Sequence, residues 1–328
     1  MAYRLKAKEP VPDGIRRIVR EEIEFAINQL TSGKGSRRGG AIHEARKSIK
    51  KIRGAVRLVQ PELGPIYRKE NERLGDTGRH LSEIRDAEAI IEVFDGVAKK
   101  YDDQLKPEAG RAIRRGLLNN KKQTEKRVKV DAVVHQAVSS LRAISRDVDS
   151  WPLKTDGFDA IAGGFKRRYR SGRYAMEDAR NDPSPETFHE WRKRVKDHWY
   201  HVRLLESLWT GIFQARESAL KELETWLGDD HNLVVLREKL NADPDRYGGE
   251  RNVQLFAGLM DEYSKELREK SLSSGERIYE QKPKLLVREM SKLWNAWKDQ
   301  PASMTDLQKE QRVQKKGPAQ VKAKRAVA

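Results

Sequence analysis

Apolar residues along this chain recur at intervals of three and four residues, which is the spacing of one face of an α-helix. The clearest run comprises Ile42, Ala45, Ile49, Ile52, Val56 and Val59. A second run with the same rhythm comprises Phe188, Trp191, Val195, His198, Val202 and Leu205. Runs of alternating β-branched residues, which would indicate strands, are not evident. The pattern therefore predicts an all-α protein whose helices pack in bundles.

The polar residues beside these two apolar runs repeat as well. In each run a His is followed by Arg at position +3, Lys at +4, Lys at +7 and Arg at +14. The first copy is His43, Arg46, Lys47, Lys50 and Arg57, and the second, 146 residues later, is His189, Arg192, Lys193, Lys196 and Arg203. Because exposed positions of an ordinary helix vary freely, a repeated row of cations suggests a repeated surface for an anionic ligand.

Two further pairs of segments match in the same order along the chain. Residues 81–90 correspond to residues 227–236 at the same offset, and residues 14–20 correspond to residues 164–170. Three matched segments in one order predict a tandem internal duplication with halves at residues 14–155 and 160–300. Each half has room for about four helices, so we expect two tandem four-helix bundles. Residues 1–13 form an N-terminal segment, and the basic tail at 301–328 is expected to be disordered.

Composition limits the classes of binding partner but does not select one of them. The 328 residues include 67 Lys and Arg against 50 Asp and Glu, a net charge of +17. Such a surplus favours nucleic acid, anionic lipid or a phosphate polymer. The chain has no cysteine, which excludes disulfides, thiolate zinc sites and cysteine nucleophiles. No stretch approaches 18 apolar residues and residues 1–13 lack the apolar region of a signal peptide, so we expect a cytoplasmic protein that does not span a membrane.

The repeated cations lie on one flank of each apolar face. Taking Ile42 as heptad position a places His43, Lys50 and Arg57 at b, and Arg46 and Arg53 at e. Six Lys or Arg stand against one acid between His43 and Arg57, so pairing at i,i+4 does not neutralise the row. A solvated helix face is the plainer interpretation, but the repetition favours a binding surface.

A second, weaker basic cluster precedes each row. Arg16, Arg17 and Arg20 precede the first row, and Lys166, Arg167, Arg170 and Arg173 precede the second. If the helix that carries a cluster packs antiparallel to the helix that carries the following row, the cluster and the row line one groove. Guanidinium and ammonium groups in such a groove suit phosphate oxygens. The candidate binding residues are therefore Arg16, Arg17, Arg20, His43, Arg46, Lys47, Lys50, Lys51, Arg53, Arg57, Lys166, Arg167, Arg170, Arg173, His189, Arg192, Lys193, Arg194, Lys196 and Arg203.

Metal binding and catalysis have weaker support. His198 occupies an apolar seam position, which is typical of a hydrogen-bonded core histidine, and His43 and His189 stand beside cations, which disfavours a metal. The segment 32–36 resembles part of a phosphate loop but lacks the Walker A spacing. An enzyme acting on phosphates would need an acidic, metal-binding cluster or a general base, and the basic rows hold almost no carboxylates. We expect no metal, no cofactor and no enzymatic activity.

The repeated residues resemble the CHAD domain, a helical family named for its histidines, over residues 14–300. The first copy matches the family pattern at His43, Arg46, Lys50, Lys51, Arg53 and Arg57. The second copy matches at His189, Arg192, Arg194, Lys196 and Tyr200, whereas Asp197 and Trp199 replace two basic residues. Leu227, Gly228 and Asp229 resemble a Leu-Gly-x-x-x-Asp element of the family, with Asn232 where Asp is usual.

This resemblance implies two four-helix bundles related by a pseudo-twofold axis, with a basic central groove that binds inorganic polyphosphate without catalysis. Polyphosphate granules are then an expected location. We expect Arg46, Lys50, Arg192 and Lys196 to matter more than Lys47 and Lys193. The alternative is a nucleic-acid-binding protein that uses the same surface, although no helix-turn-helix or RRM motif is evident.

Overall fold

The computed structural model describes residues 3–33, 35–127 and 129–300. All regular elements in these residues are helical, which confirms the all-α prediction. The α-helices are α1 (Val11–Ser32), α2 (Arg38–Leu58), α3 (Gln60–Leu63), α4 (Ile66–His80), α5 (Ser82–Lys100), α6 (Pro107–Arg127), α7 (Val130–Asp147), α8 (Asp159–Asn181), α9 (Pro185–Leu204), α10 (Thr210–Asn241), α11 (Glu250–Ile278) and α12 (Pro283–Lys298). No helix in the described ranges is long and apolar enough to cross a membrane. The basic tail at 301–328 lies outside the described residues.

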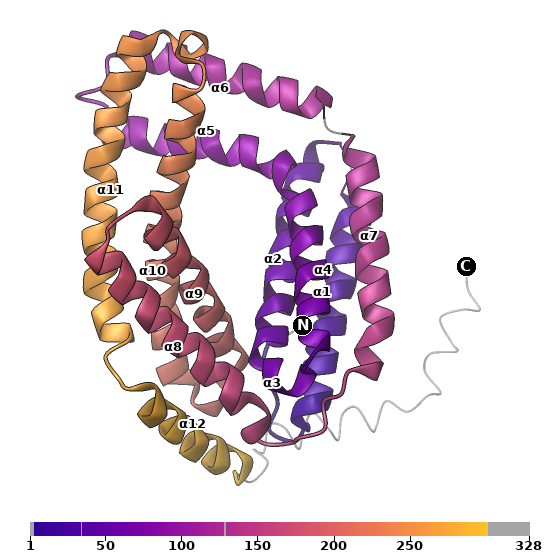
Figure 1. Ribbon diagram of the computed structural model, residues 1–328. Helices are drawn as coiled ribbons and strands as arrows, with labels where there is room; N and C mark the ends of the chain where they lie inside the picture. The colour runs from indigo at the N-terminus through magenta and orange to yellow at the C-terminus, as the bar shows by residue number, and fades with distance from the viewer. Residues whose placement is uncertain (1–2, 34, 128, 301–328) are drawn as a thin grey trace, which may run out of the picture.

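Helices α1, α2, α4 and α7 form one four-helix bundle, in which each helix packs against two neighbours (Figure 1). The apolar face of α2 supplies much of its centre, and Ile42, Ile49 and Ile52 are at most 1% exposed. The N-terminal segment joins this core through the buried side chains of Tyr3 and Leu5. Burying such side chains is the main stabilising contribution to a bundle of this kind.

Helices α8, α9, α10 and α11 form a second four-helix bundle, and α12 packs against α8. The second apolar run is buried on α9, where Phe188, Trp191 and Val195 are at most 1% exposed. His198 occupies the next seam position and is also buried. It packs against Phe165 at 5.5 Å between ring centroids, and burial lowers its pKa to about 3. The structure therefore places His198 among core residues, as its seam position predicts.

The first half contains more helices than the expected four, because α5 and α6 leave its bundle. They pack against the C-terminal part of α10 and the N-terminal part of α11, across the top of Figure 1. Phe94 of α5 meets Phe256 of α11 there, with ring centroids 5.0 Å apart. The chain bends at Leu81 between α4 and α5, which directs α5 toward the second bundle. The internal duplication itself stays a prediction.

The two helices that carry the repeated cations, α2 and α9, meet near their C-terminal ends. A Cβ on Gly54 of α2 would lie 2.7 Å from the Tyr200 Cβ, so glycine is required for this approach. The His201 ring donates through Nε2 to the Gly54 carbonyl at 3.1 Å, since a carbonyl oxygen only accepts. Arg57 forms an ion pair with Asp197 across the same contact. Toward their N-terminal ends the two helices separate, and α5 passes between the bundles there (Figure 1).

Candidate anion-binding site

A pocket of about 540 Å³ lies between the N-terminal halves of α2 and α9 and the helices α5 and α10. We call it the central pocket. It is lined by His43, Arg46, Lys50, Ala89, Ile90, Glu92, Val93, His189, Arg192, Lys193, Lys196, His231, Asn232 and Val235. Seven of these are candidate residues from the repeated pattern, and they come from both copies of it.

Positive charge dominates the lining of the central pocket. Arg46 and Lys50 come from α2, and Arg192, Lys193 and Lys196 come from α9. Spacings of three and four residues place these side chains on one face of each helix, so the two rows face each other across the pocket. Among the described lining residues, Glu92 is the one carboxylate. The pocket therefore concentrates like charges that an anionic ligand would neutralise.

Lys50 and Lys196 differ in how their charge is compensated. Lys196 donates to Oε1 of the buried Glu224 at 2.7 Å. No carboxylate of the described residues pairs with Lys50. Burial lowers the pKa of the Lys50 ammonium to about 7, and the neighbouring charges of Lys196, Arg46 and Arg192 act in the same direction.

Glu224 acts from behind the pocket wall as the counter-ion of the α9 row. Burial raises the pKa of its carboxyl, but the charges of Lys196, Lys221 and Arg192 overcome this effect and hold that pKa at about 2. Lys196 is buried deeply enough that desolvation still lowers its pKa despite this partner. Glu224 therefore stays ionised and fixes Lys196 in the pocket.

Arg46 and Arg192, the +3 residues of the two copies, are held by different neighbours. Arg46 donates through Nη2 to the Ser82 hydroxyl at the start of α5, at 2.8 Å. Arg192 lies over Gly228 of α10, where an added Cβ would stand 3.2 Å from its Nη2. The Arg192 Nη2 is also 3.7 Å from Glu224 Oε1. Both guanidinium groups are thus held against the pocket wall, where they can contact phosphate oxygens in pairs.

Three histidines complete the polar lining. His189 of α9 packs against His231 of α10, with ring centroids 4.0 Å apart. Burial lowers the pKa of His231 to about 4, and the charges of His189 and Arg192 act in the same direction. Burial, Lys193 and Arg192 likewise lower the pKa of His189. Both rings are therefore neutral at pH 7, and each can donate one N–H hydrogen bond to an anion.

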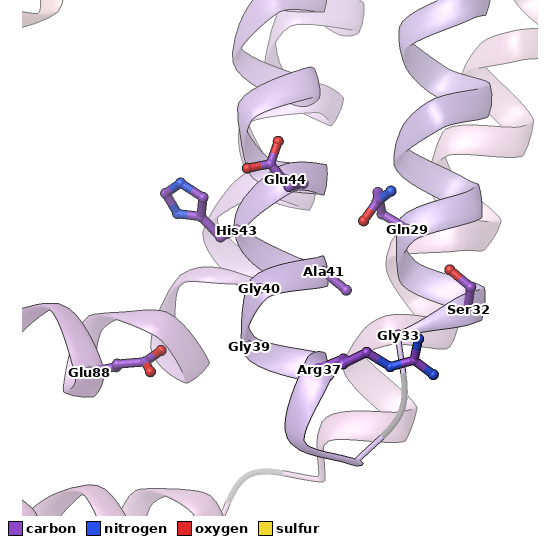
Figure 2. A pocket seen from close by; sticks show the side chains of 10 residues that line it. All are labelled: Gln29, Ser32, Gly33, Arg37, Gly39, Gly40, Ala41, His43, Glu44 and Glu88. Atoms are coloured by element: carbon purple, nitrogen blue, oxygen red, sulfur yellow. The ribbon is translucent and has the colours of Figure 1, made fainter.

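A second pocket of about 690 Å³ adjoins the central pocket at His43 (Figure 2). Figure 2 shows His43 on the side of α2 that faces Glu88 of α5, whereas Gln29 and Ser32 come from α1. Its lining has Arg37 as one cation and two carboxylates, Glu44 and Glu88. Although this pocket is the larger, it does not concentrate positive charge, and we assign the anion site to the central pocket.

The remaining candidate residues of α2 point elsewhere. Lys47 pairs with Glu44 at 3.0 Å on the exposed side of the helix. Lys51 donates to Glu22 of α1 at 2.7 Å. Arg53 donates to Asn71 of α4 at 3.2 Å, and burial together with the charge of Arg57 lowers its pKa to about 10. Arg57 is engaged by Asp197. These four cations are therefore committed to intramolecular contacts.

Two more candidates on α9 lie outside the central pocket. Arg194 donates to Glu190 at 3.0 Å. Arg203 pairs with Glu217 at 3.1 Å and stacks on Trp199 at 5.2 Å from the ring centroid. Lys193, which we expected to matter less than Arg192 and Lys196, lines the pocket and also pairs with Glu190.

The structure does not bring the clusters of α1 and α8 to the central pocket. Although α1 packs against α2, Arg16 donates to the carbonyls of Trp151 and Leu153, Arg17 to Glu9, and Arg20 pairs with Asp149. On α8, Arg173 pairs with Glu177. The other candidates on α8 line no part of the central pocket; they are Lys166, Arg167 and Arg170. The expected shared groove is therefore not seen among the described residues, because loop carbonyls and carboxylates engage Arg16, Arg17 and Arg20 and Glu177 engages Arg173.

Sequence reasoning missed the contributions of α5 and α10. His231 and Asn232 lie in the matched segment at 227–236, which was noted for its spacing and not as part of a site. Glu224 precedes that segment and had no signal of its own. Arg168 was also missed, and this buried arginine lies 3.7 Å from Asp197. No group of three or more potential metal ligands occurs in the part of the chain that the structure describes.

Comparisons with known proteins agree with this architecture. The model of the CHAD domain family matches residues 23–241, more than half of the chain. The crystal structure of the CHAD domain from the plant Ricinus communis covers 85% of this chain and 95% of its own, with 15% sequence identity and a TM-score of 0.59. A search of curated proteins found no match. At this identity the structural likeness shows the fold, and together with the family match it shows that the chain belongs to the CHAD domain family.

Proposed function

We propose that this protein binds inorganic polyphosphate in the central pocket without catalysing a reaction. The observation that carries this proposal is the meeting of Arg46 and Lys50 from α2 with Arg192 and Lys196 from α9 around one pocket. Like charges held this close raise the free energy of the empty protein, and an anionic ligand relieves that cost.

The chemistry of the lining suits phosphate groups in a chain. Arginine offers paired N–H donors to phosphate oxygens, and lysine offers a compact charge. A polymer with repeated phosphates contacts several cations at once and releases its counterions, so modest individual contacts combine into tight binding. Membership of the CHAD domain family is consistent with this ligand. We further propose that the protein acts in the cytoplasm and associates with polyphosphate granules.

Nucleic acid is the alternative ligand, and the lining supports it less well. Binding of single strands usually relies on aromatic side chains that stack on bases. None of the described residues that line the central pocket is Phe, Tyr or Trp. Trp199 is instead covered by Arg203 and Lys221. A chain of bare phosphates needs no stacking surface, so the lining favours polyphosphate.

The lining also supports binding without hydrolysis. Metal-assisted phosphoryl transfer requires carboxylates that hold the metal beside the reacting phosphate. Glu92 is the one carboxylate among the described lining residues, and Glu224 is engaged by Lys196. We therefore propose that the pocket holds the polymer and leaves its phosphoanhydride bonds intact.

Charge reversal tests the site. The variant Arg46→Glu/Lys50→Glu/Arg192→Glu/Lys196→Glu should lose binding of long-chain polyphosphate while its far-UV circular dichroism stays helical. A matched control reverses four exposed cations outside the pocket, Arg68, Lys265, Lys282 and Lys284, and so changes the net charge equally. Retention of affinity in the first variant, or equal loss in both, would show that the central pocket is not the binding site.

A further inference from the structure

A second cluster of cations surrounds a separate cavity of about 360 Å³ between α6, the C-terminal end of α10 and the 3-10 helix η4 (Pro244–Tyr247). We call it the α6 pocket. Its lining is entirely polar or charged and comprises Asn120, Gln123, Thr124, Arg127, Lys239 and Arg246. None of these residues was singled out by the repeated pattern, and none lines the central pocket.

Lys239 is the central group of the α6 pocket. It is half-buried on the last turns of α10, and no carboxylate of the described residues pairs with it. Burial lowers the pKa of its ammonium, and the charges of Arg246 and Arg127 act in the same direction. Arg127, Lys239 and Arg246 thus line one cavity, where Asp243 lies 3.7 Å from Arg246.

Close packing fixes the segment that supplies Arg246. At Gly116 of α6 an added Cβ would lie 2.5 Å from the Arg246 carbonyl oxygen, so η4 sits directly on α6. Gly248 and Gly249 follow with φ of 94° and 90°, a left-handed conformation that favours glycine. The backbone that carries the guanidinium is therefore held in one place before any ligand arrives.

Asn120 adds an independent sign of a ligand. Its Oδ1 is buried and has no hydrogen-bond partner among the described residues. Rotation of the amide exchanges its oxygen and nitrogen, so the same position can present N–H donors to an anion. A buried polar atom of this kind needs a partner, and a ligand or a water in the cavity would supply it.

We propose that Arg127, Lys239 and Arg246 form a second binding site, for a phosphate-class oxyanion. The anion is either a free short phosphate or the continuation of a chain that leaves the central pocket. Val235 lines the central pocket and Lys239 follows four residues later on the same face of α10, a rise of about 6 Å. A single chain could therefore reach both sites, although the second site does not depend on the first.

Two titrations test this site and identify its ligand. In the first, tripolyphosphate is titrated into the full chain carrying Arg46→Gln/Lys50→Gln/Arg192→Gln, which leaves the Lys196–Glu224 pair intact. In the second, long-chain polyphosphate is titrated into the natural chain. Each is repeated after adding Lys239→Gln/Arg246→Gln, and after adding the control Arg115→Gln/Arg251→Gln, which removes two exposed arginines nearby.

We expect the Lys239→Gln/Arg246→Gln change to weaken binding about tenfold in at least one titration, while the control and Lys239→Arg leave it unchanged. Loss in the first titration identifies a short free phosphate, and loss in the second alone identifies an extended chain. Unchanged affinity in both titrations would overturn the second site. Failure of the central-pocket proposal would appear differently, in a third titration, as full affinity of Arg46→Gln/Lys50→Gln/Arg192→Gln for long-chain polyphosphate.

Discussion

Lys50 and Lys196 lie four residues before Gly54 and Tyr200, the pair at which α2 and α9 touch, and both face the central pocket. Among the described residues Lys196 forms a direct ion pair with a carboxylate, that of Glu224 at 2.7 Å, whereas Lys50 forms none and feels Glu224 from farther away. The residue 146 positions before Glu224 is Gly78, which cannot supply a counter-ion to Lys50. The two copies of the repeated pattern therefore place equivalent lysines in electrically different settings.

This difference predicts opposite effects on stability. Replacing Lys50 by Met removes a partly buried ammonium that forms no ion pair among the described residues, and we expect the free energy of unfolding at pH 7 to rise by about 1–2 kcal/mol. Replacing Lys196 by Met leaves the buried Glu224 with Lys221 and Arg192, and we expect a loss of about 2 kcal/mol. Urea unfolding followed by circular dichroism measures both. Equal effects of the two substitutions would contradict the pairing seen here.

The titration of Lys50 predicts pH-dependent ligand binding. Its pKa of about 7 means that the empty protein loses this charge as the pH rises above 7. A bound polyanion stabilises the ammonium and raises that pKa, so binding takes up a proton. Because one proton is linked to binding, affinity should increase by about tenfold as the pH falls from 8 to 6.

Lys50→Arg is the matched variant for this pH effect, since arginine keeps its charge throughout the range. The other titratable groups of the pocket are His43, His189, His231, Glu92 and Lys196. Any pH dependence that survives in Lys50→Arg comes from these groups or from the terminal phosphates of the ligand. Affinity measured by isothermal titration calorimetry at pH 6, 7 and 8 separates the contributions, and an identical pH profile in both proteins would exclude Lys50 as the titrating group.

Gly228 is predicted to position Arg192. A Cβ there would lie 3.2 Å from the Arg192 Nη2, so a β-branched side chain must displace the guanidinium. We expect Gly228→Val to weaken polyphosphate binding by about tenfold, or about 1.4 kcal/mol. Gly228→Ala should have a smaller effect, because one methyl group displaces the guanidinium less. Equal binding by Gly228→Val and the natural protein, with both proteins folded, would show that Arg192 does not contact the ligand.

Gly164 is predicted to hold the two bundles together. An added Cβ at this position of α8 would lie 1.9 Å from the Leu58 carbonyl oxygen of α2, which the backbone cannot avoid. We expect Gly164→Ala to destabilise the protein by about 3 kcal/mol. At Gly258 of α11 nothing lies within 4 Å of an added Cβ, so Gly258→Ala should stabilise it by up to about 1 kcal/mol. Thermal unfolding of both variants measures the contrast, and a Gly164→Ala protein as stable as Gly258→Ala would contradict the close contact between α2 and α8.

The sequence predicted the features that depend on hydrophobic periodicity, but fewer of those that depend on the direction in which a helix packs. The helical faces at Ile49 and Val195 and the burial of His198 followed from their spacing. The bend at Leu81 could not be predicted in this way, because the apolar helical pattern around Phe94 is compatible with packing in either bundle. Bundle packing therefore had to be seen before α5 could be placed beside the central pocket.

The site shows the same division. Arg46, Lys50, Arg192 and Lys196 could be named from the sequence, because they share one helix face and one repeated spacing. The cluster at Arg16, Arg17 and Arg20 looked equally basic, but its partners at Glu9, Asp149 and Trp151 come from segments brought near by folding. Charge in a sequence does not show which carboxylates or carbonyls will meet it.

A competition titration tests the central claim most directly. Long-chain polyphosphate is bound to the purified protein at about 150 mM salt, where nonspecific electrostatic binding is weakened. Duplex DNA, single-stranded RNA and tripolyphosphate are then added as competitors. If the central pocket is a polyphosphate site, excess nucleic acid leaves the polymer bound. If nucleic acid displaces it on equal terms, the +17 net charge acts as a general polyanion surface and the proposed function is wrong.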